Sequence, residues 1–471
     1  MDKAMFKVQT YLNRRHNLKT RIDSGITVFM GNDESPMNYT DNTYHFRQDS
    51  SFLYYFGLNT AGLTGIVDVD EGKDYIFGND LTVEDFVWMG YQPALKDQAQ
   101  KTGIENTGSI PDLKKFLKEA VTKGRIIHLL PPYRAENKIK LFHWLDINPK
   151  ETQKAASVEL IKAVVAQREI KSDEELLEIE KAVDTTVDMH VTAMRMVRPG
   201  ILESEIASKV QEIATKDSGN ISFPIIATKH GETLHNHYHG NQLKEGDMFL
   251  LDCGAETAMG YAGDLSSTMP VSASFTERQS EIYNIVLASH NASIEMLKPG
   301  IPFKEIHYQA CRIIIDGMKD LDLMKGDTKE ALQLGAHAMF FPCGLGHQMG
   351  LDVHDMEDLG EVYVGYEGKP KSSQFGIKSL RMSKPLAPGM VLTIEPGIYF
   401  IPSLIDMWRA EKRFTDFINY DNLEAYKDFG GIRNEENFVI TADGYKLIGK
   451  NKPKTIEDVE KQKNKRNSYE V

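Results

Sequence analysis

Cysteine is scarce in this chain, where Cys253, Cys311 and Cys343 are the three examples among 471 residues. Three thiols cannot build a disulfide framework, and such low usage is typical of proteins from a reducing compartment. The N-terminal residues lack the apolar core of a secretory signal peptide. No run of about 18 apolar residues occurs, so no membrane-spanning helix is expected. The sequence therefore predicts a cytoplasmic protein without a membrane partner.

Positive charge is also in short supply. The chain has 55 Lys and Arg against 68 Asp and Glu, which gives a net charge of −13. Nucleic-acid binding requires clustered positive charge, so this composition argues against a general nucleic-acid partner. Hydrophobic residues make up 41% and charged residues 26%, as in ordinary globular proteins. The length suits two or three domains with cores large enough to need no disulfides.

The first part of the chain alternates between predicted strands and helices. Strands are expected at 62–70, 73–77 and 125–130, with a helix at 110–122 between them. This pattern predicts an α/β unit, and it contains no catalytic constellation.

A long helical stretch follows, at about residues 157–198. Ser172 and Glu175 have the spacing of a capping box within it. The domain boundary is expected close to residue 160. At the other end, the charge-rich segment from Lys452 to Val471 predicts a solvated helix or a disordered end.

The second part of the chain contains an internal echo. One helical stretch ends in Pro199-Gly200-Ile201 and another in Pro299-Gly300-Ile301, and each is followed by an acidic first turn. A chance repetition of a common turn is the alternative. Because the flanking helical periodicity recurs too, we favour a pseudo-duplicated domain.

Five short segments place histidine or carboxylate side chains at the ends of predicted strands or in turns. Asp in a strand is disfavoured, and strand alternation puts Arg433 and Glu435 on one face, where the arginine could hold a carboxylate. Each segment alone also fits an ordinary turn, loop or exposed edge. The residues are Asp252 and Asp264 in 248–272, His347 and His354 in 340–355, Glu395 in 389–400, Arg433 and Glu435 in 429–441, and His230, His235, His237 and His239 in 227–241.

Taken together, four carboxylates with one or two histidines form an oxygen-dominated donor set. Such a set suits Mn, Fe or Co better than a structural zinc site, which would use thiolates. One cation cannot offset four negative charges, so two adjacent ions are expected, and these could share and activate a water.

These segments resemble the aminopeptidase P and prolidase family of dinuclear metallopeptidases, which have the creatinase-like, pita-bread fold. The resemblance covers nearly the whole chain, including FRQDSSFLYYFGL (46–58) and VWMG (87–90). The motifs DCGAETAMGYAGD, GLGHQMGLDVHD, VLTIEPGIYF and GGIRNEE occur in the family's order. The implied fold class is α+β, with a non-catalytic N-terminal α/β domain at 1–160, a pseudo-twofold pita-bread domain at 161–455 and a charged tail at 456–471.

The resemblance also implies roles for individual residues. Two divalent ions are implied, with Mn(II) expected first and Co, Fe or Zn as alternatives. His235 and His354 would contact substrate and stabilise the tetrahedral intermediate, and Glu395 would also transfer a proton. Arg433 would support a ligand, and Arg381 would hold the carboxylate of a dipeptide. The five implied metal ligands are Asp252, Asp264, His347, Glu395 and Glu435.

The implied activity is hydrolysis of the Xaa-Pro bond at the N-terminus of peptides, as in an Xaa-Pro aminopeptidase. A prolidase restricted to Xaa-Pro dipeptides is the close alternative, and Arg381 favours it. A creatinase-type enzyme and a non-catalytic binding module would lack the five ligands. The implied partners are proline-containing peptides and a second copy or more of the chain, in a homodimer or homotetramer.

Three positions depart from the family pattern. Cys343 replaces a usual histidine, four residues before His347, which makes it the doubtful member of the site. Asn434 replaces an apolar residue and is expected on the face opposite Glu435. The spacing from Asp252 to Asp264 is one residue longer than expected, and a hairpin loop can absorb one residue as a bulge.

Overall fold

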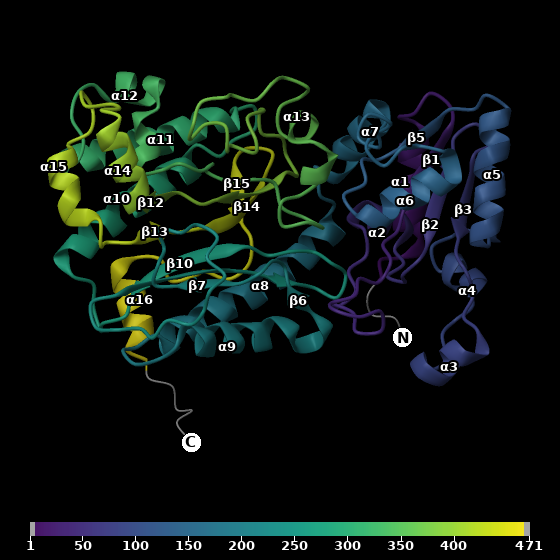
Figure 1. Ribbon diagram of the computed structural model, residues 1–471, viewed down its shortest axis with the longest axis horizontal. Helices are drawn as coiled ribbons and strands as arrows, with labels where there is room; N and C mark the ends of the chain where they lie inside the picture. Colours follow the sequence, from purple (N-terminus) through teal and green to yellow (C-terminus); the bar gives the residue numbers. More distant parts are fainter. Residues whose placement is uncertain (1–4, 466–471) are drawn as a thin grey trace. The chain divides into compact units, whose positions relative to one another are not determined.

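The computed structural model describes residues 5–465. The chain forms two compact units (Figure 1). The first comprises the chain up to Arg168 together with Met356–Val364, and the second comprises Glu169–Asp355 and the chain from Gly365 onward. Among the described residues, no helix combines the length and the apolar character that crossing a membrane requires.

The first unit is built on a five-stranded mixed sheet in the order β4-β3-β2-β1-β5. Four neighbouring pairs hold it together, two antiparallel (β1 with β2, β2 with β3) and two parallel (β1 with β5, β3 with β4). The strands are β1 (Ile26–Met30), β2 (Thr64–Asp68), β3 (Lys73–Phe77), β4 (Asn106–Gly108) and β5 (Ile127–Leu129).

Helices cover both faces of this sheet because successive strand residues alternate between them. Ile26 and Val28 of β1 face a core that includes Leu117 of α5 and Trp144 of α6. Phe29, one residue further, instead contacts the ring of Tyr55 in α2, at 4.7 Å between centroids. The helices of this unit are α1 (Val8–Lys19), α2 (Ser50–Phe56), α3 (Val83–Met89), α4 (Leu95–Gln100), α5 (Ile110–Thr122), α6 (Ala135–Leu145), α7 (Val158–Arg168), η3 (Glu357–Leu359) and α13 (Glu361–Val364).

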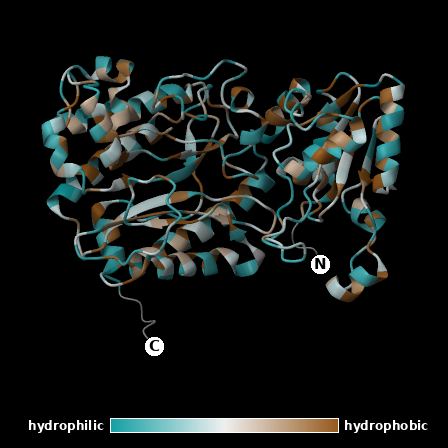
Figure 2. Cartoon of the chain, viewed as in Figure 1, coloured by the Kyte–Doolittle hydropathy of each residue, from teal (hydrophilic) through white to brown (hydrophobic). Residues whose placement is uncertain are grey.

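The predicted helical stretch is two helices rather than one, and the second unit begins between them. The chain leaves α7 at Arg168 and starts α8 (Asp173–Met196) at Ser172. The predicted capping box is confirmed, since Ser172 and Glu175 exchange side-chain and backbone hydrogen bonds. Apolar and polar residues alternate along α8 and α9 (Glu203–Thr215), as Figure 2 shows.

The predicted internal duplication is present in the hydrogen bonds as well as the sequence. The amide of Gly200 donates to the carbonyl oxygen of Leu243, and the amide of Gly300 donates to that of Leu386, both at 2.8 Å. The return bonds run from Leu243 to Ile201 and from Leu386 to Ile301. In each copy, the ninth residue after that leucine is a carboxylate, Asp252 or Glu395.

Each copy lays a helix pair over a small sheet. Helices α8 and α9 cover the sheet β10-β8-β7, and α10 contacts β11, β12 and β13 while pairing with α11 (Figure 1). The remaining elements of this unit are η1 (Lys216–Ser218), β6 (Asn220–Ile221), β7 (Ile226–Thr228), β8 (Met248–Cys253), β9 (Ala255–Glu256), β10 (Leu265–Pro270), α10 (Glu277–Glu295), α11 (Phe303–Asp320), α12 (Thr328–Leu334), η2 (Ala336–Met339), β11 (Val391–Ile394), β12 (Gly397–Tyr399), α14 (Pro402–Ala410), α15 (Tyr420–Leu423), η4 (Glu424–Tyr426), β13 (Gly431–Arg433), β14 (Glu436–Ile440), β15 (Tyr445–Leu447) and α16 (Ile456–Lys463).

The hairpin of β8 and β10 keeps one register along its length. Asp252 lies opposite Ser266, and the same register continues to the bridge between Glu256 and Ala262. No bulge therefore interrupts this pairing. The hairpin closes in a turn, where Gly260 donates its backbone N–H to the carbonyl of Thr257 at 2.8 Å.

The charged C-terminal segment was predicted to be a solvated helix or a disordered end, and the structure has the helix but packs one side of it against the core. Residues Ile456–Lys463 form α16, which contacts α8, and Val459 is fully buried in the same core cluster as Met189 of α8. Lys463 donates from Nζ to the carbonyl oxygen of Val197, the C-cap of α8, at 2.9 Å. The many charged residues of this segment favoured a prediction of solvent exposure, although the helix buries one of its few apolar residues completely. The last part of the predicted tail, residues 466–471, lies outside the described residues.

Candidate metal centre

A cavity of about 400 Å³ lies within the second unit. All ten site residues named from the sequence line it, although they come from segments spread over some two hundred positions. They are His235, Asp252, Asp264, Cys343, His347, His354, Arg381, Glu395, Arg433 and Glu435. Of the other histidines in the 227–241 loop, His237 also lines the cavity.

The four carboxylates stand in or beside paired strands of the two copies. Asp252 lies in β8, and Asp264 immediately precedes β10. In the other copy, Ile394 lies opposite Glu436, so Glu395 and Glu435 each sit one residue beyond that pair. Each copy thus delivers two carboxylates from one antiparallel pair of strands.

His347 reaches the same place from a glycine-rich loop that runs beside β11. The amide of Thr393 donates to the carbonyl of His347 at 3.0 Å, and the amide of Glu395 donates to that of Leu345 at 2.8 Å. A Cβ on Gly346 would lie 2.1 Å from the carbonyl oxygen of Thr393, so only glycine permits this approach.

Hydrogen bonding fixes which nitrogen of His347 faces the carboxylates. Its Nδ1 lies 3.1 Å from the carbonyl oxygen of Gln348, which can only accept, so Nδ1 carries the proton. Its Nε2 lies 3.4 Å from Asp264 Oδ2 and 3.5 Å from Glu395 Oε1. Burial lowers the pKa of His347, but the facing carboxylates outweigh burial and raise it overall.

Arg433 ties two carboxylates together. Its guanidinium donates to Asp252 Oδ2 at 2.5 Å, to the hydroxyl of Ser266 at 2.8 Å and to the hydroxyl of Tyr399 at 2.8 Å. Ser266 in turn donates to Glu435 Oε2 at 2.9 Å. One arginine therefore orients Asp252 directly and Glu435 through a serine.

Three of the carboxylates have a buried oxygen without a hydrogen-bond partner among residues 5–465. Within the described residues, Asp252 Oδ1, Asp264 Oδ1 and Glu435 Oε1 are buried and accept no hydrogen bond. One donor atom from each of Asp264, His347 and Glu435 lies within 4.8 Å of the others. Buried carboxylate oxygens without partners are costly unless a cation binds them, so these residues fit divalent metal ions.

The crowding of negative charge appears in the pKa values as well. Burial raises the pKa of Glu395 to about 7, even though His347 and Arg433 lower it, and Asp264 and Asp252 raise it further. Burial and the neighbouring carboxylates also raise the pKa of Asp264 and Glu435. Adjacent cations would reverse these shifts and hold the carboxylates ionised.

Two further histidines border the candidate ligands. The rings of His347 and His354 lie 4.3 Å apart between centroids, at 69°. Burial lowers the pKa of His235, and the charge of Arg433 lowers it further, with a smaller contribution from Arg381. His235 is thus a neutral imidazole that can donate one N–H into the cavity.

The unusual Cys343 lines the same cavity. Burial raises the pKa of its thiol to about 12, and the charge of Glu395 adds to this effect. The side chain is therefore a neutral thiol rather than a thiolate. At Asn434, the second departure, the amide oxygen accepts a hydrogen bond from Lys452 Nζ at 2.7 Å.

Sequence reasoning missed the residues that support the ligands. Ser266 and Tyr399 hold Arg433, and Asn437 brackets the backbone of Asp264, accepting from its N–H at 3.3 Å and donating to its carbonyl at 2.6 Å. The alternation Asp264, Ser266, Thr268 along β10 could have marked Ser266 as facing the same side as Asp264.

Paired carboxylates and a histidine around a buried cavity define the class of metal-dependent hydrolases. The model of metallopeptidase family M24 matches residues 178–442, and that of the aminopeptidase P N-terminal domain matches residues 11–128. The chain belongs to metallopeptidase family M24 and has its pita-bread catalytic fold, as the sequence resemblance implied.

Relatives over most of the chain carry two different names. The Xaa-Pro dipeptidase of Rattus norvegicus is 30% identical and covers 92% of this chain and 87% of its own length. A probable Xaa-Pro aminopeptidase of Sordaria macrospora is also 30% identical, and the match covers 93% of this chain and 91% of the relative. Among solved structures, zinc-substituted Escherichia coli aminopeptidase P in complex with product has a TM-score of 0.79 at 25% identity, covering 98% of this chain and 99% of its own. Proline aminopeptidase P II from Yersinia pestis has a TM-score of 0.79 at 26% identity, and the match covers 98% of this chain and 100% of that structure.

Proposed function

We propose that this protein is an Xaa-Pro aminopeptidase that removes the residue before proline from the N-terminus of peptides. The observation that supports this most is the convergence of Asp252, Asp264, His347, Glu395 and Glu435 on one buried cavity. A prolidase restricted to Xaa-Pro dipeptides is the second candidate, because Arg381 lines that cavity and could bind a substrate carboxylate.

The five residues would hold two divalent cations, and their oxygen-rich composition favours Mn(II). Bound there, the cations supply Lewis-acid polarisation and a water of lowered pKa. Arg433 and Ser266 keep Asp252 and Glu435 oriented for binding.

Glu395 is the proposed proton carrier. It accepts a proton at a carboxylate oxygen as water attacks the carbonyl before proline, and it returns that proton to the proline nitrogen as the bond breaks. His235 and His354 donate N–H groups to the carbonyl oxygen as it gains negative charge, each worth about 100-fold or more in rate.

The cavity wall explains a preference for proline. Phe223, Ile226, Leu234 and Val353 give it an apolar lining beside the histidines. Proline offers a rigid ring and no N–H, so an apolar surface can receive it without leaving a donor unpaired.

The test compares an Xaa-Pro dipeptide and an Xaa-Pro-Yaa tripeptide on metal-stripped enzyme, with and without added Mn²⁺. Mn-dependent cleavage of both before proline supports the aminopeptidase, and cleavage of the dipeptide alone supports the prolidase. The variant Asp264→Asn should lose activity, whereas Asp421→Asn, whose side chain is 89% exposed, should keep it. Absence of cleavage with either peptide rejects both candidates.

The role of Arg381 separates the two candidates further. If Arg381 binds the carboxylate of a dipeptide, Arg381→Ala raises KM for the dipeptide about tenfold or more and changes the tripeptide less. Equal effects on both substrates would argue against a carboxylate contact.

The low cysteine content supports a proposal for the cellular setting. Three cysteines, none in a disulfide within the described residues, suit the reducing cytoplasm.

We also propose a homodimer or homotetramer, supported by exposed apolar side chains on α3 of the first unit.

A further inference from the structure

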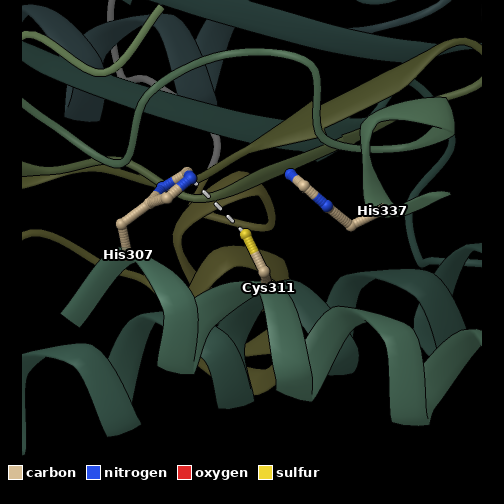
Figure 3. A group of neighbouring side chains, drawn as sticks. All are labelled: His307, Cys311 and His337. Carbon is tan, nitrogen blue, oxygen red and sulfur yellow. Dashed lines mark hydrogen bonds between the residues drawn. The ribbon is translucent and has the colours of Figure 1, made fainter. Parts of the chain in front are cut away.

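A second cluster of metal-binding side chains lies outside the cavity. His307 and Cys311 stand four residues apart on α11, so they share one face of the helix. His337 belongs to η2, the short helix that follows α12. Figure 3 shows the two imidazoles on either side of the Cys311 sulfur.

The three side chains are close enough to hold one ion. A donor atom from each lies within 4.8 Å of the other two, and Cys311 Sγ lies 3.6 Å from His307 Nε2. The imidazole centroids are 6.4 Å apart, with the rings at 77°. All three side chains have 0% exposure.

The imidazoles are not satisfied by the protein around them. Within the part of the chain that the structure describes, His307 Nδ1 and both nitrogens of His337 are buried without a hydrogen-bond partner. Buried polar atoms in folded proteins almost always have a partner, so this concentration of orphaned nitrogens points to a missing ligand.

Another buried His–Cys pair in the same unit provides the contrast. His190 also lies 3.6 Å from a cysteine sulfur, that of Cys253. Its nitrogens, however, contact the Ser267 hydroxyl at 3.0 Å and the Cys253 carbonyl at 3.3 Å. A cysteine neighbour therefore does not by itself leave a buried histidine without partners, whereas in the cluster on α11 three of the four ring nitrogens lack one within the described residues.

The protonation states suit metal binding. Burial lowers the pKa of His307 to about 3 and of His337 to about 4, so both rings are neutral at neutral pH. Burial raises the pKa of the Cys311 thiol well above its usual range. The thiol therefore gives up its proton only when a cation replaces it: Cys311–SH + M²⁺ → Cys311–S–M⁺ + H⁺.

We propose that His307, Cys311 and His337 form a second, structural metal site that binds Zn²⁺ through two imidazoles and one thiolate. This nitrogen and sulfur donor set selects zinc, unlike the carboxylates of the cavity. A tetrahedral ion takes four ligands, so one position remains for a water.

A bound ion would fix the segment that leads to the cavity. It joins α11 to η2, and the chain continues from η2 through Cys343 to His347, the candidate histidine ligand of the cavity. Because the cluster is fully buried, the ion would enter during folding and resist brief chelation.

The test measures zinc in the full-length protein produced in zinc-supplemented medium and then dialysed briefly against EDTA. The protein carries Asp264→Asn, so that the cavity is disabled and contributes no retained ion. About one zinc per chain should remain, and Cys311→Ser should lose it. Cys343→Ser and Cys253→Ser are the matched controls and should retain it.

Cobalt gives an independent readout on the same proteins. Co²⁺ in the site should show a thiolate-to-metal charge-transfer band that disappears in Cys311→Ser and persists in Cys343→Ser. Absence of retained metal, or loss of the band in Cys343→Ser instead, overturns the proposal.

Should Cys311→Ser fail to fold, zinc-edge X-ray absorption of the EDTA-treated parent protein decides the matter. One sulfur neighbour with nitrogen neighbours supports the site, and a shell without sulfur rejects it. None of these outcomes depends on peptidase activity, so the proposed function stands or falls separately.

Discussion

Arg433 shows how one side chain can organise a metal centre. It contacts Asp252 directly and Glu435 through Ser266, and its third bond to Tyr399 fixes the guanidinium plane. A planar fork that donates in three directions is something lysine cannot reproduce. The geometry of two carboxylates from different strand pairs thus depends on a residue that is not one of the five candidate ligands.

Replacing this arginine should therefore weaken metal binding. For Arg433→Gln we expect the Kd for Mn²⁺ to rise about 10- to 100-fold, because Asp252 and Glu435 lose their orientation. Titration calorimetry measures this, with Arg409→Gln, at a side chain 43% exposed, as the control. Tyr399→Phe should produce a smaller loss. An unchanged Kd in Arg433→Gln would refute the supporting role.

A buried histidine makes the stability depend on pH. Burial and the charge of Lys452 lower the pKa of His190 from 6.5 to about 3 in the folded chain. Between these values the unfolded chain binds a proton that the folded chain does not. The stability that His190 contributes is complete above pH 6.5 and is lost as the pH falls toward 3.

The variant His190→Gln removes this dependence. Relative to the variant, the wild type should lose about 2 kcal/mol in its free energy of unfolding between pH 7 and pH 5. Urea denaturation of both proteins at both pH values measures these changes. Subtracting the change in the variant from the change in the wild type gives a double difference, from which the contributions of the other titrating groups cancel. The exposed His143→Gln serves as the control. A double difference near zero would mean that His190 titrates normally when folded.

Residue chemistry was the most predictable part of the site. The ten residues to which the family motifs assigned a place in the site all line the cavity, because the order of these motifs along the chain identified them. Ser266, Tyr399 and Asn437 could not be found in this way. Ser266 and Tyr399 bind Arg433 of β13, and Asn437 of β14 binds Asp264, so these contacts join residues that are far apart in the sequence; strand alternation could mark the side to which Ser266 points but not its partner.

At the scale of elements, two strand pairs bring the carboxylates together and a loop delivers the histidine. That loop depends on its glycines for close passage beside β11. Gly346 is the tightest example, since its missing side chain leaves room for the Thr393 carbonyl. The position of His347 thus depends on the absence of a side chain at Gly346.

A side chain at this position should be strongly disruptive. Gly346→Ala would place Cβ 2.1 Å from the Thr393 carbonyl oxygen, so the loop must move away from β11. We expect a loss of about 2 kcal/mol or more in stability and of most activity. Thermal unfolding and peptide hydrolysis measure both. Gly444→Ala, where a Cβ would meet nothing within 4 Å, is the control and should change neither.

Elements with strong local signals were predicted well. The helix at 110–122 has the bounds expected from its sequence, and Ser172 begins α8 as its capping box predicted. The errors arose where tertiary packing decides. Val459 packs α16 into the core beside α8, and the long spacing between Asp252 and Asp264 leaves the pairing of β8 with β10 undisturbed.

At the scale of the whole molecule, the duplicated second unit carries the chemistry. Each copy supplies two carboxylates, so the cavity requires both halves to be folded. The predicted boundaries at residues 160 and 455 stay predictions. In the structure, α7 groups with the first unit, which also includes the distant segment Met356–Val364, and no local sequence signal indicates that excursion.

The first unit leaves one surface unexplained within a single chain. None of the residues of α3 is buried, although Thr82 and Asp85 cap the helix with reciprocal hydrogen bonds. Val83, Val87 and Trp88 are 80%, 76% and 86% exposed, and Tyr91 is 81% exposed. Such apolar exposure on a well-capped helix is typical of a surface that another chain covers.

If that chain is a second copy, one substitution should separate the oligomer. Light scattering of the wild type should give a multiple of the 53.2 kDa chain mass, and Trp88→Glu should reduce it because a buried carboxylate would face an apolar partner surface. Val121→Glu, on α5 at 54% exposure, should leave the mass unchanged. A monomeric wild type, or an oligomer that survives Trp88→Glu, would place no interface at α3. Because α3 belongs to the first unit and the cavity to the second, Trp88→Glu should leave the metal content unchanged, so any loss of activity in it would reflect assembly itself.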